Sequence, residues 1–437
     1  MKTVIMAGGK GTRIASLFGD IPKPMIRIAG KPVLEHELER LRDQGFTDLI
    51  ITVSHLGNVI MDYFGDGSGI SPATGKPFGV NIEYYNEETP LGNAGALFKL
   101  RDRLDGDFLL LNADAMFDID FRRIVDYHRR NGGLATILTH PNSHPYDSGL
   151  IIADDRHRVE AWLTKEDPRP EFYDNRVNAG LHVINSLLLD ECGIDPAMVG
   201  MPGENGKTVK VDLDRQLLKP LAGTGRLICY DSPEYVKDMG TPERFAAVER
   251  DFLHGTVAAR NLSHPQKAIF LDRDGTINRY VGFLRRTEQM ELIPGVAEAI
   301  RKINESGYLA IVVTNQPVIA RGETTVEELD EIHRKMATLL GKEGAYTDVL
   351  YYCPHHPDKG FEGEVAELKI DCDCRKPKPG MLLRAARDFN IDLSASWMIG
   401  DSEADVKAGE AAGCRTILVE RDAPGALLKA VDEILKK

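Results

Sequence analysis

The sequence predicts an α/β protein made of two doubly wound, Rossmann-like parallel-sheet domains. Short β-rich apolar runs alternate with helix-length amphipathic segments over the first 130 residues, which is typical of a parallel sheet covered by helices. A second series of the same kind begins at Lys267. The chain has 437 residues, more than one ordinary hydrophobic core holds, so at least two domains are expected.

The first domain is expected to span residues 1–254. Its buried strands are predicted at 3–7, 48–54, 80–85 and 107–114, and its helices at 34–45 and 94–104. Between Leu134 and His182, closely spaced strands replace the helices, which indicates an antiparallel addition to the sheet.

The second domain is expected to span residues 267–437. Residues 255–266 have weak periodicity and a proline, so they are interpreted as a linker. Strands and helices then alternate to the end of the chain, with strands at 268–271, 308–316, 348–353 and 397–401, helices at 296–307, 326–340 and 381–390, and a final strand–helix pair.

Composition limits the classes of partner. Hydrophobic residues make up 42% and charged residues 28%, as in globular proteins, and no apolar run reaches the length of a membrane span. The net charge of −13 disfavours a nucleic-acid partner. The N-terminus resembles a buried strand rather than a signal peptide, so we expect a cytoplasmic protein. Small phosphorylated substrates remain compatible with this charge, and assembly into a homo-oligomer is left open.

A glycine-rich turn directly follows the first strand. Glycines in such a turn let backbone N–H groups approach a phosphate, although a plain tight turn has the same composition. The turn lacks the spacing of a Walker loop and the third glycine of a dinucleotide fingerprint. Arg13 and Lys23 favour the phosphate interpretation, because triphosphate chemistry needs fixed cations for the leaving pyrophosphate.

Two separated carboxylates are candidates for Mg²⁺. Asp114 ends a predicted strand, where ligands of open α/β sheets bind, although an Asp there is also a common turn former. Asp238, in YVKDMGTPE, is the second. A carboxylate from each half of the domain could hold Mg²⁺ between nucleotide and substrate.

Six motifs in order, GGKGTR, IPKPM, ETPLGNAGAL, NAD, NAGLHVI and DMGTPE, resemble the sugar-1-phosphate nucleotidyltransferases over residues 1–250, and the heptose and mannose guanylyltransferases most. This resemblance implies attack of a sugar 1-phosphate on the α-phosphate of an NTP, with GTP the best guess. It also implies roles for individual residues: triphosphate binding by Gly8, Gly9, Gly11, Thr12 and Arg13; charge neutralisation by Lys23; base or sugar contacts by Leu91, Gly92 and Asn93; Mg²⁺ binding by Asp114 and Asp238; sugar-phosphate contact by Lys165; and a sugar pocket at Asn178 and Gly180.

The sequence departs from that pattern at two places. Ala113 stands where the family more often has Gly. Thr164-Lys165-Glu166-Asp167-Pro168 replaces a more common Glu-Lys-Pro, which affects the assignment of Lys165. Nothing in these motifs identifies the base.

In the second domain, Asp272 and Asp274 follow the first strand two residues apart. One carboxylate can attack phosphorus to form an aspartyl phosphate, while the other donates and accepts protons. Mg²⁺ is needed to bring an anionic nucleophile to a phosphate. A DxDGT segment alone is also compatible with a polar turn or a calcium loop.

Three further motifs follow in order. Thr314 and Asn315 offer a hydroxyl and an amide to phosphate, Arg375 and Lys376 offer cations, and Asp401, with Asp405 beyond it, offers the remaining metal carboxylate. Residues 267–437 therefore resemble the haloacid-dehalogenase (HAD) superfamily of phosphatases. The resemblance implies Asp272, Asp274 and Lys376 as catalytic residues, and Asp272, Asp274 and Asp401 as Mg²⁺ ligands. The short segment from Thr276 to Pro294 leaves no room for a cap domain.

Two close pairs of soft ligands flank one polar loop: Cys353 with His355, and Cys372 with Cys374. Four such ligands suit a structural, tetrahedral Zn²⁺, and a reducing compartment disfavours a disulfide. His356 is an alternative to His355. The segment CPHHP…CDCRKPKPGM resembles the zinc-loop phosphatases that act on heptose bisphosphate, with histidinol phosphatase as a sister group, although Pro317-Val318 replaces a more common Ser-Gly.

Together the two resemblances imply a bifunctional enzyme that removes the 7-phosphate of a heptose 1,7-bisphosphate and joins the heptose 1-phosphate to a nucleotide. Three alternatives stay open. The same chemistries could serve another sugar phosphate, for example in a mannose 1-phosphate guanylyltransferase joined to a histidinol-phosphatase-like domain. One domain could be inactive in a binding or scaffold protein. The second domain could act as a regulatory brake on the product.

Overall fold

The computed structural model describes residues 1–9, 19, 21–203 and 206–436. The backbone forms two compact units. The first unit comprises Met1–Thr139, Ile151–Trp162 and Asn178–Ala258, and the second comprises His140–Leu150, Leu163–Val177 and Ala259–Lys437. The predicted linker contains the short helix α8 (Thr256–Ala259), and the predicted domain limits stay a prediction.

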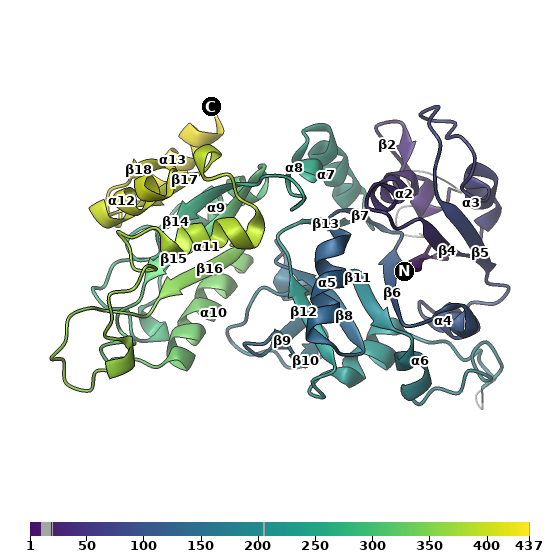
Figure 1. Ribbon diagram of the computed structural model, residues 1–437, viewed down its shortest axis with the longest axis horizontal. Helices are drawn as coiled ribbons and strands as arrows, with labels where there is room; N and C mark the ends of the chain where they lie inside the picture. The colour runs from purple at the N-terminus through teal and green to yellow at the C-terminus, as the bar shows by residue number, and fades with distance from the viewer. Residues whose placement is uncertain (10–18, 20, 204–205, 437) are drawn as a thin grey trace. The chain divides into compact units, whose positions relative to one another are not determined.

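The first unit is built on a mixed nine-stranded sheet (Figure 1). Its strands are β1 (Thr3–Met6), β4 (Asp48–Val53), β5 (Asn81–Asn86), β6 (Asp107–Asn112), β8 (Ala135–His140), β9 (Leu150–Ala153), β10 (Val159–Leu163), β11 (Val177–Asn185) and β12 (Leu227–Asp231). The last residue of β8 and of β10, and the first residue of β9 and of β11, belong to the second unit. The order β6-β1-β4-β5 is parallel throughout. These strands are almost wholly apolar and buried, as expected when helices cover both faces of a parallel sheet.

Helices cover the two faces of this sheet with separate cores. One core joins Ile5 and Leu49 to α2 (Val33–Asp43), α3 (Gly57–Phe64) and α5 (Phe121–Asn131). The other joins Val4 and Ile50 to α4 (Gly95–Lys99) and α6 (Leu187–Glu191). Successive residues of one strand therefore enter opposite cores, which follows from the two-residue period of a strand.

The predicted antiparallel addition is confirmed. β11 pairs antiparallel with β6, with Leu181 opposite Leu111, and also with β9. A separate two-stranded ribbon pairs β7 (Ala115–Asp118) antiparallel with β13 (Tyr235–Asp238), and a second one pairs β2 (Arg27–Ile28) with β3 (Lys31–Pro32). The helix α7 (Pro242–Leu253) follows β13.

The helix predicted over residues 94–104 is shorter than expected. It consists of α4 and a separate 3-10 turn at Arg101–Arg103. The Arg101 guanidinium binds the Asp190 carboxylate at 2.6 Å and the Leu104 carbonyl at 3.0 Å. These contacts from outside the helix oppose its continuation, since tertiary contacts routinely override helix propensity.

The second unit contains an all-parallel five-stranded sheet of order β16-β15-β14-β17-β18, seen as a row of arrows in Figure 1. Its strands are β14 (Lys267–Leu271), β15 (Tyr308–Asn315), β16 (Val349–Cys353), β17 (Trp397–Gly400) and β18 (Arg415–Leu418). Ile269 and Leu271 pack with α9 (Val296–Asn304), α10 (Val326–Lys342) and α13 (Ala426–Leu435). Ala268 and Phe270 pack on the other face with α11 (Gly380–Phe389) and α12 (Glu403–Ala412). The α/β fold class is thus confirmed for both parts of the chain.

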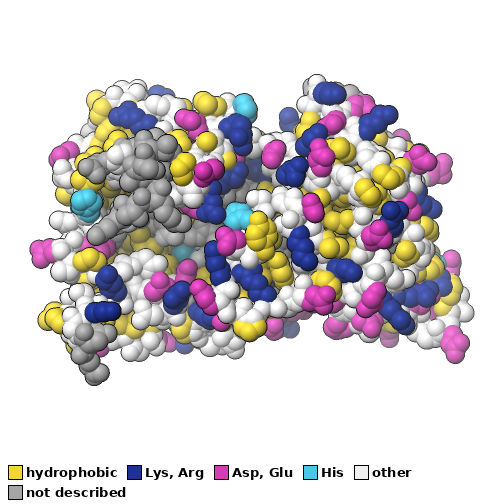
Figure 2. Space-filling model, turned by 180° about the vertical axis from the view of Figure 1, so that it is seen from behind, with side chains coloured by type: hydrophobic (Ala, Val, Ile, Leu, Met, Phe, Trp, Pro, Cys, Tyr) yellow, Lys and Arg dark blue, Asp and Glu magenta, His cyan; other side chains and the backbone are white. Residues whose placement is uncertain are grey.

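Over the described part of the chain, none of the helices is long and apolar enough to cross a membrane. On the face of the molecule in Figure 2, Lys and Arg side chains lie interspersed with Asp and Glu.

Candidate active sites

A cleft of about 740 Å³ opens at the carboxyl edge of the first sheet. It is lined by residues that directly follow four neighbouring strands: Gly8 and Gly9 after β1, Ser54 after β4, Glu87 after β5, and Ala113 and Asp114 after β6. Ligands of open α/β sheets bind at this edge, so the cleft is the candidate active site of the first unit.

Lys23 joins the two predicted metal carboxylates. Its buried ammonium lies 3.0 Å from Asp114 Oδ2 and 3.6 Å from Asp238 Oδ1. The antiparallel pairing of β7 with β13 sets Asp238 opposite Ala115, beside Asp114. Asp238 also forms an ion pair with Arg244. The two carboxylates, far apart in sequence, therefore share one cation at this cleft.

The structure brings together part of the predicted nucleotide site. Six predicted residues line the cleft: Gly8, Gly9, Lys23, Gly92, Asn93 and Asp114. The Asn93 side chain accepts a hydrogen bond from the Leu213 backbone N–H at 2.8 Å, which fixes the loop over the cleft. Gly11, Thr12 and Arg13 lie outside the described residues.

Four residues that were predicted to contact the substrate are not among the described residues that line this cleft: Leu91, Lys165, Asn178 and Gly180. The Lys165 ammonium pairs with Asp147 at 2.6 Å and is largely exposed. Asn178 Oδ1 accepts the Gly180 N–H at 3.1 Å, so that pair supports its own strand. Their roles with substrate stay predictions.

Sequence reasoning missed three charged residues that line the cleft, Glu87, Glu88 and Lys210. Lys210 adds a cation and Glu87 adds a carboxylate. Glu87 comes two residues after the predicted strand at 80–85, so the rule that singled out Asp114 would have found it as well. Lys210 lies outside helix and strand, and its sequence surroundings contain no signal for it.

The candidate site of the second unit centres on a buried ammonium. Lys376 Nζ lies 2.5 Å from Asp272 Oδ1, 2.6 Å from Asp405 Oδ1 and 2.8 Å from the Val313 carbonyl. Burial raises the pKa of Asp272 to about 7, against the lowering effect of Lys376 and with support from the charges of Asp405 and Asp274. The ammonium of Lys376 therefore offsets part of the free-energy cost of burying the Asp272 carboxylate.

Carboxylate oxygens of Asp272, Asp401 and Asp405 lie within 4.8 Å of one another, a donor set that suits a divalent cation. Two glycines permit this approach. A Cβ on Gly275, whose φ is +88°, would lie 2.5 Å from Asp401 Oδ2, and one on Gly400 would lie 2.4 Å from Asp405. Both positions therefore need glycine.

The Asp274 carboxylate turns away from this cluster. It pairs with buried Arg273 at 2.8 Å and accepts hydrogen bonds from Gln316 at 2.8 Å and Asn278 at 3.1 Å. Burial alone would raise the pKa of Asp274, but Arg273 and these bonds hold it below its usual value. The third carboxylate of the cluster is therefore Asp405, whereas the sequence analysis predicted Asp274 as the third metal ligand.

The predicted phosphate contacts lie around a cleft of about 190 Å³. It is lined by Asp272, Asp274, Thr314, Asn315, Arg375, Lys376 and Asp401, among others. Asn315 fixes the main chain of Lys376 twice, through its Oδ1 to the N–H and its Nδ2 to the carbonyl, each at 3.0 Å. All four predicted motifs therefore meet at one edge of the sheet.

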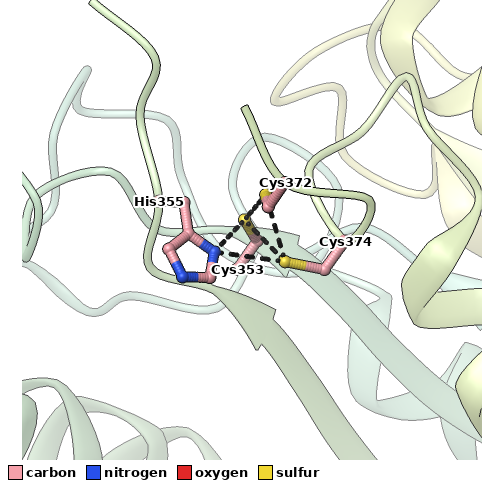
Figure 3. Close-up of side chains that lie close together, drawn as sticks. All are labelled: Cys353, His355, Cys372 and Cys374. Carbon is pink, nitrogen blue, oxygen red and sulfur yellow. Dashed lines mark hydrogen bonds between the residues drawn. The ribbon is translucent and has the colours of Figure 1, made fainter. Parts of the chain in front are cut away.

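Three thiols and one imidazole nitrogen meet beside that cleft (Figure 3). Five ligand-to-ligand distances among Cys353, His355, Cys372 and Cys374 run from 3.2 to 3.7 Å. Bonds of about 2.0–2.3 Å to a tetrahedral zinc would set such distances near 3.5–3.8 Å. The donor set and its spacing therefore fit Zn²⁺.

Of the two neighbouring histidines, His355 is the one whose ring enters the cluster. The Nδ1 atom of His356 instead accepts the Asp358 backbone N–H at 3.2 Å. Arg375 donates to the His355 carbonyl at 3.2 Å, so the cluster is tied to the basic pair that lines the phosphate cleft.

Comparison with known proteins matches both parts of the chain. The Nucleotidyl transferase family profile matches residues 2–202, and the HAD-hydrolase-like profile matches residues 373–431. D-glycero-beta-D-manno-heptose-1,7-bisphosphate 7-phosphatase from Yersinia pestis is 44% identical over 154 residues, covering 35% of this chain and 80% of the relative. The protein of that name from Escherichia coli (strain K12) is also 44% identical over 154 residues, with 35% and 78% covered. The crystal structure of HddC from Yersinia pseudotuberculosis is 23% identical, has a TM-score of 0.45, and is covered to 99% by 57% of this chain.

The fold, the two sites and these matches define a fusion of two enzyme domains, a nucleotidyltransferase followed by a HAD phosphatase. The phosphatase part of the chain belongs to the D-glycero-beta-D-manno-heptose-1,7-bisphosphate 7-phosphatase family.

Proposed function

We propose that this chain is a bifunctional enzyme of nucleotide-activated heptose synthesis, acting in the cytoplasm. Its second part would remove the 7-phosphate of D-glycero-D-manno-heptose 1,7-bisphosphate. Its first part would transfer GMP from GTP to the resulting heptose 1-phosphate, releasing pyrophosphate and forming GDP-heptose. The observation that carries the proposal is a phosphatase domain 44% identical to heptose bisphosphatases with a nucleotidyltransferase domain on the same chain.

In the phosphatase step, an Asp272 carboxylate oxygen would attack the phosphorus of the 7-phosphate. The bond between phosphorus and the C7 oxygen breaks, and the leaving oxygen would take a proton from Asp274, which first has to leave the Arg273 ion pair that holds its pKa low. Water then attacks the aspartyl phosphate and gives its proton back to Asp274. Lys376 keeps Asp272 in place through its 2.5 Å contact, and Thr314, Asn315 and Arg375 would hold the phosphate oxygens.

The residues of this site also fit a divalent cation. Asp272 and Asp401 would hold Mg²⁺, with Asp405 in the same cluster. Bound there, Mg²⁺ neutralises charge between the carboxylate and the phosphate. Asp274 would become a third ligand only by leaving Arg273.

In the transfer step, an oxygen of the sugar phosphate would attack the α-phosphate of GTP, and pyrophosphate would leave. Gly8 and Gly9 would receive the triphosphate, and Lys23 would neutralise it. Asp114 and Asp238 would hold Mg²⁺, because both face the same cation position beside the cleft. Positioning and neutralisation carry this reaction, since it needs no covalent intermediate.

The cluster of Cys353, His355, Cys372 and Cys374 would hold a structural Zn²⁺. Four protein ligands complete a tetrahedral shell and leave no open position for chemistry. Since Arg375 and Lys376 directly follow Cys374, the ion would fix where both cations point.

Two variants of the full chain test the division of labour. Asp272→Asn should abolish phosphate release from the bisphosphate and leave transfer onto heptose 1-phosphate intact. Asp114→Ala should do the reverse, and Glu410→Gln, an exposed carboxylate on α12, is the control. If neither variant changes either activity, the result would favour a scaffold protein over an enzyme. A panel of sugar phosphates would reveal a preference for another sugar.

A further inference from the structure

We propose that His333 is a positioning residue of the phosphatase site: its imidazole anchors the Arg273 guanidinium, so that the Asp274 carboxyl can leave that guanidinium and reach the leaving group alone. The inference rests on the proposed phosphatase step, in which Asp274 has to leave its ion pair with Arg273 before it gives a proton. It identifies the side chain that supports this release.

The Arg273 side chain is completely buried. Its Nε and Nη2 donate to the Asp274 carboxylate at 2.8–3.2 Å, and its Nη1 binds His333 Nε2 at 3.0 Å. Over the part of the chain that the structure describes, no other group accepts a hydrogen bond from this guanidinium. His333 is therefore the partner that stays with Arg273 when Asp274 moves.

His333 lies on the long helix α10, whose position the core fixes. Ile332, the preceding residue, is completely buried in the core that covers one face of the sheet. The imidazole ring lies 5.7 Å from the ring of Tyr352 on β16, measured between centroids. Asp274, in contrast, lies in the turn after β14. The imidazole thus belongs to a fixed element, whereas the carboxyl belongs to a loop.

The chemistry of the pair defines the form of the imidazole. A guanidinium has donors and no acceptor, so Nε2 of His333 has to accept, and Nδ1 carries the proton of the neutral ring. Burial and the charge of Arg273 hold the pKa of His333 well below its usual value, which keeps the ring neutral. A neutral acceptor holds Arg273 in place without competing for its charge as a second carboxylate would.

The anchor matters at the moment when Asp274 moves. If Arg273 moved together with Asp274, the carboxylate would stay ionised and could not give a proton to the leaving oxygen. His333 opposes that joint movement, because the guanidinium would lose its 3.0 Å bond. After release, the same bond keeps one partner for a buried cation, whose unpaired donors would otherwise cost more free energy than a hydrogen bond contributes.

The test uses two phosphate esters that differ in their need for a proton. The C7 oxygen of the heptose bisphosphate leaves with a proton, whereas p-nitrophenolate leaves as a stable anion. We expect His333→Phe, which keeps an aromatic ring without an acceptor, to lower kcat/KM of the full chain for the bisphosphate by at least about tenfold, the effect of one hydrogen bond to a charged group. The value for p-nitrophenyl phosphate should fall by less than about threefold, because its leaving group needs no acid.

Matched variants separate the hydrogen bond from the packing. His333→Gln, whose amide oxygen can accept from Arg273, should keep kcat/KM for the bisphosphate within about threefold of the wild type. In an Arg273→Met background no guanidinium needs an anchor, so His333→Phe should cause no further loss. Exposed His264→Phe is the control. Thermal unfolding checks each variant, and His333→Ala replaces His333→Phe if the latter does not unfold cooperatively.

Three results would overturn the role of His333: an unchanged kcat/KM for the bisphosphate in His333→Phe, equal losses for the two esters, or the same loss in the Arg273→Met background. A loss in His333→Gln as large as that in His333→Phe would also overturn it. If the wild type hydrolyses another sugar phosphate but not the heptose bisphosphate, the proposed substrate is wrong, and the comparison with that sugar phosphate still decides the role of His333. If it hydrolyses no phosphate ester, both proposals fail.

Discussion

The ammonium of Lys376 lies 2.5 Å from Asp272 and 2.6 Å from Asp405, and the three side chains are almost completely buried. One cation thus holds two carboxylates of the phosphatase site at once. Asp405 Oδ2 also accepts the Ser402 N–H at 3.0 Å, so the same aspartate caps α12. Direct contacts therefore hold together the Asp272 nucleophile, the start of α12 and the loop that carries Lys376.

Lys376→Ala should abolish phosphatase activity and destabilise the second unit. Removing one member of a buried ion pair leaves uncompensated charge, which costs about 3–5 kcal/mol. The pKa of Asp272, already raised to about 7, should rise further because Lys376 lowers it. Phosphate release and thermal unfolding measure both effects. Lys378→Ala, an exposed lysine two residues on, is the control, and equal losses in the two variants would contradict this role.

Cys374→Ser should remove one zinc per chain and with it most phosphatase activity. The Ser hydroxyl is a poor substitute for a thiolate, and the freed loop would no longer fix Arg375 and Lys376. Elemental analysis and phosphate release are the measurements. Cys192→Ser, outside the cluster, should keep the zinc. A wild-type chain purified without zinc that is fully active would refute the assignment.

Lys210 is a second candidate for the sugar-phosphate contact that the sequence analysis predicted for Lys165, and substitution separates the two. Lys210 lines the first cleft, whereas Lys165 pairs with Asp147 outside it. Lys210→Ala should lower kcat/KM for transfer by about 10- to 100-fold, the cost of one charged contact to phosphate. Lys165→Ala should lower it less, and exposed Lys76→Ala serves as control. A larger loss of kcat/KM in Lys165→Ala than in Lys210→Ala would indicate that Lys165 contacts the sugar phosphate.

Asp214→Asn should make the protein more stable at neutral pH. Burial, with help from Asp212, raises the pKa of Asp214 from 3.8 to about 6. Between these values the folded state binds more protons than the unfolded state, so stability is present at low pH and is lost as pH rises through 6. The substitution removes this loss, worth about 2–3 kcal/mol.

Urea unfolding of the wild type and of Asp214→Asn at pH 4.5 and 7.5 measures this difference. The gain in the variant should be larger at pH 7.5. A gain that does not depend on pH would show that Asp214 does not titrate in this window.

Most of the phosphatase site could be predicted from the sequence, because three of its four motifs lie at the end of a strand and parallel strands end at one edge. Asp272, Thr314, Lys376 and Asp401 meet there as predicted. The direction of a carboxylate is not visible in a motif: Arg273 draws Asp274 away, and Asp405 joins the cluster instead. The choice between His355 and His356 likewise depended on how one loop turns.

The nucleotidyltransferase site was harder to predict, because loops form much of it. Lys165 was inferred from a motif that this sequence only partly keeps, and its ammonium binds Asp147. Lys210 reaches the cleft from a segment without helix or strand, whose path depends on tertiary contacts such as that of Asn93 with Leu213. Periodicity cannot report such contacts.

The most direct test of the account is a ³¹P NMR time course of the purified chain with heptose 1,7-bisphosphate, GTP and Mg²⁺. The account predicts that inorganic phosphate from C7 appears first, followed by pyrophosphate and the two signals of a GDP-sugar. Retention of both sugar phosphates, or loss of the anomeric phosphate first, would contradict it.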